Sequence, residues 1–142
     1  MFVLDTNTIS DYFRGDATVV TRLQSLAPSQ VGIPTVVLYE LRYGLSRLPQ
    51  GVASQRLHGL EQLILPIKLL PFGDAAAQAA ATISVALERA GEGAGLHDIQ
   101  IAATTIVNGG TLVTRNTKSF TRIPGLAIVN WQDDISIDMR AD

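Results

Sequence analysis

The first residues of the chain constrain its fold more than any other segment. An apolar run over residues 1–4 ends at Asp5, and the polar residues Thr6, Asn7 and Thr8 follow directly. This pattern predicts a buried β-strand that carries a carboxylate at its carboxyl end. In parallel α/β sheets, ligands bind at the edge where the strands end. The start of the chain therefore favours an α/β fold with an acidic site at that edge.

Short strand-like runs alternate with helical stretches along the rest of the chain. Strands are expected over residues 2–5, 31–33, 67–70, 111–114 and 127–129. Helices are expected over residues 9–14, 17–27, 35–47, 52–64, 75–90 and 96–108. Asp74 is the expected N-cap of the helix that begins at residue 75. This alternation predicts a central parallel sheet of about four to five strands flanked by helices.

No repeat, low-complexity segment or linker divides the 142 residues, a length that suits one domain. We expect this domain to cover residues 1–131 and to be followed by an acidic tail over residues 132–142. No apolar segment is long enough to span a membrane and no signal peptide is apparent, so the expected location is the cytoplasm.

The cysteine and histidine counts restrict the chemistry. The chain has no cysteine, which excludes disulfides, thiolate nucleophiles and cysteine-based zinc sites. Its 2 histidines are isolated from each other, so a histidine-rich metal site is not expected either. A metal ion would be held by oxygen atoms, which favours Mg²⁺ or Mn²⁺.

Two further acids, Glu40 and Asp98, stand in apolar segments. Helical spacing puts Glu40 at the margin of an apolar stripe, with Gly44 one turn away, and puts Asp98 in the first turn of its helix. Each acid alone has an ordinary explanation: Asp5 as a helix cap, Glu40 as an exposed rim residue, Asp98 as a charge at a helix start. Carboxylates are rarely buried unless they are paired or bind metal, so the three together indicate one acidic pocket that holds a cation.

Such a pocket suits phosphodiester chemistry. Carboxylates that lie close together raise each other's pKa and destabilise the fold unless a cation compensates. Mg²⁺ binds through one or two carboxylates together with waters and a substrate phosphate, and it can activate a water and stabilise a leaving oxygen. The uncharged side chains of Thr6, Asn7, Thr114 and Asn116 can orient a water beside the acids.

Four segments resemble the PIN domain, and more narrowly the VapC-type toxins of bacterial toxin–antitoxin pairs. They are residues 4–10 (LDTNTIS), 39–44 (YELRYG), 98–103 (DIQIAA) and 112–120 (LVTRNTKSF), the last followed by 123–126 (IPGL). The form of the last segment resembles the FitB-like branch. The resemblance extends from residue 1 to about residue 131, which is nearly the whole chain.

The resemblance implies an endoribonuclease that depends on Mg²⁺ or Mn²⁺, is usually a homodimer and is inhibited by a cognate antitoxin. It assigns Asp5, Glu40 and Asp98 as metal-binding and catalytic residues. It assigns Asn116 as a fourth catalytic position, which holds Asp or Asn in the family. Ser119 stands where a further acid often follows, so the site is light in carboxylates.

The charge distribution adds an RNA-binding candidate. The net charge of −2 alone argues against nucleic-acid binding. No acid lies between Asp98 and Asp133, however, and Arg115, Lys118 and Arg122 fall in this interval. We expect these three basic residues to hold the RNA backbone beside the acids. The alternative is that Arg115 or Arg122 pairs with the acidic tail.

The implied antitoxin carries a DNA-binding head, so the expected contact with DNA is only indirect. The helices expected over 35–47 and 52–64 offer a docking surface through apolar side chains. These are Leu45, Leu48, Val52, Leu57 and Leu60. We expect a short helix of the antitoxin to lie there, with an arginine that pairs with the acids. Another apolar face is expected to form the homodimer.

Other interpretations remain open at this point. A HAD-like phosphatase also begins with an apolar strand ending in Asp, but it needs a second Asp where Asn7 stands. A receiver-like domain needs a phosphoacceptor Asp on a middle strand, and the strand at 67–70 lacks one. A non-enzymatic PIN-fold protein that only binds RNA or protein is favoured by the missing fourth acid. A PIN-fold protein that processes RNA without a toxin role is a further alternative. Metal-dependent RNA cleavage separates the nuclease from a protein that only binds RNA.

Overall fold

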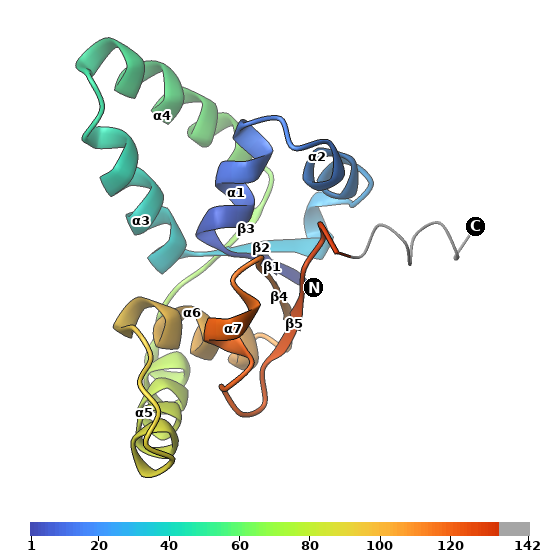
Figure 1. Ribbon diagram of the computed structural model, residues 1–142. Helices are drawn as coiled ribbons and strands as arrows, with labels where there is room; N and C mark the ends of the chain where they lie inside the picture. Colours follow the sequence, from blue (N-terminus) through green and yellow to red (C-terminus); the bar gives the residue numbers. More distant parts are fainter. Residues whose placement is uncertain (134–142) are drawn as a thin grey trace.

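Five parallel strands form the centre of the molecule in the computed structural model, which describes residues 1–133 (Figure 1). They are β1 Phe2–Leu4, β2 Val31–Pro34, β3 Lys68–Leu70, β4 Thr111–Val113 and β5 Ala127–Val129. Their order across the sheet is β3-β2-β1-β4-β5, and each neighbouring pair is parallel. The expected parallel sheet is therefore confirmed.

Helices cover both faces of this sheet. They are α1 Thr6–Phe13, α2 Ala17–Gln24, α3 Thr35–Ser46, α4 Gln50–Ile64, α5 Asp74–Arg89, α6 Leu96–Val107 and α7 Thr117–Phe120, and a 3₁₀ turn spans Pro28–Gln30. In Figure 1, α1 to α4 lie on one side of the sheet, with α3 and α4 projecting as an arm, while α5 to α7 lie on the other side. No helix among the described residues is long and apolar enough to cross a membrane.

The strand order reverses at β1. The chain passes from β1 outward to β2 and β3, and then crosses back to β4 on the other side of β1. The region beyond the carboxyl ends of β1 and β4 is therefore a topological switch point, which is where open α/β sheets bind ligands.

The strands and α6 supply much of the core. Val3 and Leu4 on β1 and Leu112 on β4 are fully buried, as expected for parallel strands with helices on both faces. Helix α6 is also buried along most of its length, since it packs against the sheet and against α5. The buried hydroxyl of Thr105 on this helix donates to the Ile101 carbonyl at 2.8 Å, so this buried polar group has a hydrogen-bond partner.

Several helix boundaries differ from the expected ones. Helix α1 begins at Thr6, not at residue 9, because the Asp5 carboxylate accepts the Thr6 amide at 2.8 Å and caps the helix. The prediction that Asp74 is an N-cap is wrong. Gly73 holds that position, and the Asp74 carboxylate instead accepts from Gln78 Nε2 at 2.9 Å within the helix. The 3₁₀ turn and the 4-residue α7 were not expected, since such short elements leave no periodic pattern.

The chain beyond β5 returns to the first strand. Trp131 is buried, and its ring meets that of Phe2 edge-on at 5.9 Å. The side-chain amide Nε2 of Gln132 donates to Asp16 Oδ2 at 2.9 Å. Residues 134–142, which hold most of the expected acidic tail, lie outside the described residues. The domain boundary at residue 131 therefore stays a prediction.

Candidate active site

Asp5 lies at the switch point, directly after β1. Its backbone amide donates to the Val113 carbonyl of β4 at 3.1 Å, which extends the pairing of the two strands by one residue. Its side chain is only 5% exposed. Oδ2 accepts from Thr114 Oγ1 at 2.7 Å and from Asn7 Nδ2 at 3.2 Å, while Oδ1 accepts from the Thr6 amide. These donors fix the direction of the carboxylate.

The environment of Asp5 opposes its ionisation. Burial raises its pKa from 3.8 to about 6, with smaller upward contributions from the nearby charges of Asp98 and Glu40, against the hydrogen bonds from Thr114 and Thr6. The carboxylate is thus held as an anion near neutral pH at a cost in folding free energy. A cation bound beside it would remove that cost.

Glu40 joins three helices at the site. It lies on α3, and its Oε1 accepts from the Thr6 hydroxyl of α1 at 2.6 Å. Its Oε2 lies 3.3 Å from Nδ1 of His97 on α6. The sequence analysis gave no role to His97, because the two histidines are isolated from each other. The structure instead places it against one of the acids, and only its position next to Asp98 in the chain could have signalled this.

Asp98 completes the acid cluster, by which we mean Asp5, Glu40 and Asp98. It stands in the first turn of α6 and is partly buried. Its pKa is raised by burial first and by the charge of Glu40 second, and it is lowered by His97. Two of the three acids therefore have raised pKa values, each with another acid of the cluster among the causes. The three acids are thus near enough to influence one another's ionisation, while their roles as metal-binding and catalytic residues stay predictions.

Asn116 is linked to Asp5 through one hydroxyl group. The Asn116 backbone amide donates to Thr114 Oγ1 at 3.0 Å, and the same hydroxyl donates to Asp5. The Asn116 side-chain oxygen accepts from Ser119 Oγ at 3.1 Å. Thus Thr114, Asn116 and Ser119 form one uncharged group on the β4 side of the acids.

The donors present fit a hard cation. The acid cluster offers only carboxylate oxygens, and hydroxyl and amide groups surround it. Among residues 1–133, no three Asp, Glu or His side chains are close enough together to form a ready-made metal cage. Magnesium needs only one or two protein carboxylates, because it keeps several waters. The residues therefore suit a partly hydrated ion better than a fully enclosed one.

Comparison with known proteins identifies the family. The family model described as PIN domain matches residues 2–126. This chain belongs to the PIN domain family. A PIN domain is neither a HAD-like phosphatase nor a receiver domain, so those two alternatives are set aside.

Two relatives and one solved structure illustrate the similarity to other PIN domains. The chain is 34% identical over 139 residues to Toxin FitB of Neisseria gonorrhoeae, covering 94% of this chain and 100% of that one. It is 31% identical over 131 residues to the tRNA(fMet)-specific endonuclease VapC of Salmonella typhimurium, with 92% and 97% coverage. The fold matches VapBC2 from Rickettsia felis, bound to a DNA fragment from its promoter, with a TM-score of 0.84, 29% identity and coverage of 92% and 98%.

Arg115 of this PIN domain has a partner that the sequence did not suggest. Its Nε lies 3.0 Å from Oδ2 of Asp11, which also pairs with Arg14 and accepts from Gln132 Nε2 at 3.3 Å. Asp11 is only 6% exposed. Asp11 is therefore a buried member of an ion-pair network near the end of α1. The sequence carries no signal for this network, because its members are brought together only by the fold.

The other two basic candidates of the PIN domain, Lys118 and Arg122, are exposed beyond β4. They are available to a polyanion, whereas the charge of Arg115 is partly neutralised by Asp11. No observation tests their binding to RNA, which stays a prediction for all three residues.

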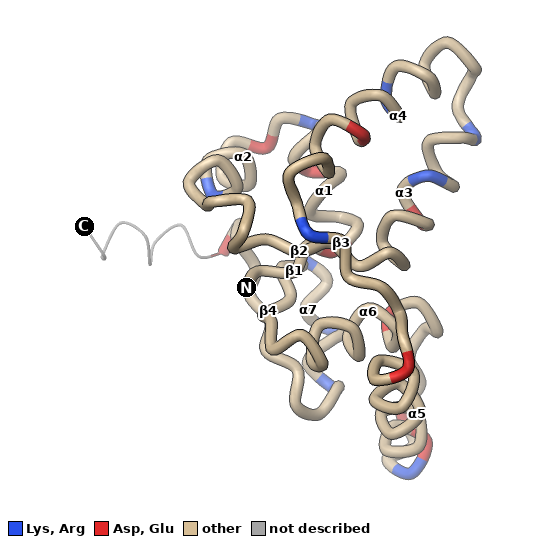
Figure 2. Tube along the Cα trace, turned by 180° about the vertical axis from the view of Figure 1, so that it is seen from behind, with Lys and Arg blue, Asp and Glu red and all other residues tan. Residues whose placement is uncertain are grey.

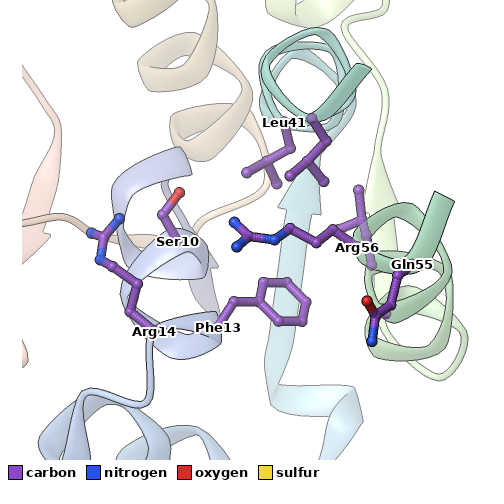
Figure 3. A pocket seen from close by; sticks show the side chains of 9 residues that line it. Ser10, Phe13, Arg14, Leu41, Gln55 and Arg56 are labelled. Carbon is purple, nitrogen blue, oxygen red and sulfur yellow. The ribbon is translucent and has the colours of Figure 1, made fainter. Parts of the chain in front are cut away.

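A cavity of about 610 Å³ separates the arm of the PIN domain from α1 (Figure 3). Its apolar walls include Phe13 from α1 together with Leu41 and Leu45 from α3. In Figure 3 the side chain of Arg56 extends from α4 into the cavity. Of the apolar residues expected to form a docking surface, Leu45 and Leu60 line this cavity, while Leu48, Val52 and Leu57 do not. The cavity thus includes two of the five expected residues and also residues of α1, and docking of a partner there stays a prediction.

Proposed function

We propose that this PIN domain is an endoribonuclease that depends on Mg²⁺ or Mn²⁺ and acts in the cytoplasm as the toxin of a toxin–antitoxin pair. The observation that carries the proposal is the acid cluster at the switch point, where Asp5 is buried and its pKa is raised to about 6. The similarity to FitB and to VapC endonucleases supports the same activity.

The side chains have separate proposed roles. Asp5, Asp98 and Glu40 would hold the metal ion, which when bound supplies Lewis acidity toward a water and the scissile phosphate. Thr114 and Asn7 hold the Asp5 carboxylate in one orientation. Thr6 and His97 do the same for Glu40. Asn116, oriented by Ser119, presents an uncharged polar group to a water or to the RNA.

Phosphate contacts are proposed for the basic residues beyond β4. Arg115, Lys118 and Arg122 would hold the RNA backbone, with Lys118 and Arg122 contributing more because Arg115 is paired with Asp11. Each phosphate contact steepens the dependence of the binding constant on salt by about one logarithmic unit or somewhat less. Lys118→Gln and Arg122→Gln should therefore weaken binding of all RNA sequences and flatten this dependence, which a salt titration would measure.

An antitoxin is the proposed protein partner. The cavity between α1 and the arm would accept apolar anchors of a short helix. An arginine of that helix would pair with the acid cluster in bidentate fashion and compete with the metal ion. Contact with DNA would occur only through the antitoxin. The toxin itself is proposed to be a homodimer.

The test is a cleavage assay on the chain purified alone and together with the product of the adjacent small gene. We expect the free chain to cut single-stranded or looped RNA with Mg²⁺ or Mn²⁺ and to lose this activity in EDTA. The co-purified partner should suppress cleavage, and suppression should weaken as the metal concentration rises. Binding without cleavage under every metal condition would favour the non-catalytic PIN protein. Cleavage that no partner inhibits would favour an RNA-processing enzyme.

A further inference from the structure

Helix α3 carries a row of exposed aromatic and basic side chains. Tyr39, Tyr43 and Arg47 follow one another at intervals of one turn, and we call them the tyrosine ladder. The two rings are stacked, with centroids 6.1 Å apart and an interplanar angle of 20°. The Arg47 guanidinium lies over the Tyr43 ring, 5.5 Å from its centroid.

The ladder starts at the acid cluster. The His97 ring meets the Tyr39 ring edge-on with centroids 5.6 Å apart, and His97 Nδ1 lies 3.3 Å from Glu40 Oε2. A ligand that extends along α3 from the acids therefore meets Tyr39 first, then Tyr43 and finally Arg47.

The fold does not need these rings. Tyr39 and Tyr43 are each 56% exposed, whereas Val37, Leu38 and Leu41 form the buried face of the same helix. Gly44 follows Tyr43, and a Cβ added to it would have no atom within 4 Å. The helix surface beside Tyr43 is thus open to a ligand.

We propose that Tyr39 and Tyr43 stack on unpaired bases of the RNA that lies in the active site, and that Arg47 contacts the backbone beyond them. This inference rests on the proposed ribonuclease function. Bases of every kind present a π-face, so aromatic side chains bind single strands with little dependence on sequence. Each stacked base contributes about 1–3 kcal/mol by alanine substitution.

The position of this face beside the acid cluster favours RNA over a second protein surface, because Tyr39 contacts His97 and His97 contacts Glu40. Tyr and Arg are enriched at protein interfaces as well, so residue type alone does not decide between the two partners. Here Arg47 lies against Tyr43 and His97 lies against Tyr39, so nitrogen-bearing groups stand at both ends of the aromatic pair. Figure 2 shows both basic and acidic residues along α3 and α4, and Arg42 of α3 pairs with Glu61 of α4. Two adjacent rings followed by the Arg47 cation match neighbouring bases and a phosphate of a single strand.

The position of the two tyrosines predicts which part of the RNA substrate is single-stranded. Nucleotides on one side of the cut must be unpaired, because a base in a duplex cannot offer its face to Tyr39 or Tyr43. The identity of these bases should matter little. A duplex that covers this side of the cut should be a poor substrate even when the other side is single-stranded.

The binding test uses an inactive background. Asp5→Asn carrying Tyr39→Ala or Tyr43→Ala would be titrated with a fluorescein-labelled single-stranded RNA, read by anisotropy. We expect each alanine to weaken binding by about 5- to 150-fold, which is the range given by about 1–3 kcal/mol. The corresponding phenylalanine variants should recover most of the loss, because the ring is retained. Leu65→Ala, which shortens an exposed apolar side chain outside α3 and α6, is the matched control.

The stacking itself is tested with 2-aminopurine placed at successive positions of the same RNA. Its fluorescence should be quenched at one or two adjacent positions by the parent protein, and the quenching should be lost with the alanine variants. Unchanged affinity and quenching in both alanine variants would overturn the proposal. So would a loss of dimer by sedimentation with no change in RNA affinity, since a second copy would then cover the ladder.

Cleavage by the chain with native Asp5 separates this inference from the proposed function. If it cuts RNA in Mg²⁺ or Mn²⁺ while the tyrosine variants bind normally, only the stacking inference fails. If RNA binds through the tyrosines but is never cut, only the ribonuclease function fails. If no RNA binds at all, both fail.

Discussion

Two regions meet at Glu40, and they are built in opposite ways. The strand edge, formed by Asp5, Thr6, Thr114 and Asn116, is held by short hydrogen bonds around a buried carboxylate. The arm, formed by α3 and α4, has exposed rings and a cavity between it and α1. The strand edge can hold a reacting group in one geometry. The arm instead presents exposed side chains and a cavity to a ligand.

The largest effect is expected from the acid cluster, which adjoins the strand edge. Asp5→Asn or Asp98→Asn removes a charged metal ligand and should lower RNA cleavage by at least about 100-fold, since metal activation supplies several kcal/mol. Glu40→Gln should cost nearly as much. A gel assay under single-turnover conditions measures the rates. Asp74→Asn, at an exposed acid of α5, is the control and should cleave normally. Full activity of Asp5→Asn would mean that the Asp5 carboxylate does not act in the chemistry.

The second effect is on stability and depends on pH. The pKa of Asp5 is about 6 in the folded chain against 3.8 for an ordinary Asp, so the folded state binds this proton more tightly than the unfolded state. Protonation thus stabilises the fold, and this contribution is lost as the pH rises from about 4 through about 6. The shift corresponds to about 3 kcal/mol.

In metal-free buffer at neutral pH, Asp5→Asn should therefore be at least as stable as the native chain, and more stable by roughly 1 kcal/mol or more. The gain is less than the full pKa effect because the amide loses part of the hydrogen bonding to Thr114 and Thr6. Urea unfolding at several pH values measures the free energy of unfolding of both proteins. If the stability gain of Asp5→Asn over the native chain grew as the pH falls, Asp5 would be stabilised as an anion in the folded chain.

A third change tests how much the Thr114 hydroxyl contributes to the stability of the strand edge. Thr114→Val keeps the shape of the side chain and removes the hydroxyl that joins Asn116 to Asp5. It should destabilise the fold by about 1–3 kcal/mol, since buried polar groups lose a partner. It should also raise the pKa of Asp5 further, because this hydrogen bond lowers it. Thr114→Ser keeps the hydroxyl and should restore both properties, as urea unfolding and the pH dependence of stability would show.

The smallest effect concerns the arm. Gly44→Ala adds a methyl group where no atom lies within 4 Å, in the interior of α3. It should stabilise the chain by about 0.5–1 kcal/mol through helix propensity. Gly51→Ala in the first turn of α4 is an equally open control. A loss of stability in Gly44→Ala, measured by thermal unfolding, would mean that this part of α3 is constrained like the strand edge.

The strand edge was more predictable from the sequence than the arm. Asp5 follows an apolar run, and Glu40 and Asp98 stand in apolar helical segments. These local patterns were enough to predict that the three acids share one pocket. The start of α1 was missed because the Asp5 side chain caps it, which apolar spacing does not reveal. Asp11 was missed because Arg115 and Gln132 reach it from more than 100 positions away along the chain. Such contacts depend on the assembled sheet and leave no local trace.

The bond between Thr114 and Asp5 joins residues 109 positions apart in the chain. During synthesis, Asp5 leaves the ribosome early, whereas β4 and Thr114 come from the last third of the chain. Until residues 111–114 are made, β1 lacks its partner on that side and Asp5 lacks the hydroxyl that orients it. A partly made chain therefore lacks the Thr114 side of the acid cluster, and the order of residues delays completion of this cluster until β4 has been made.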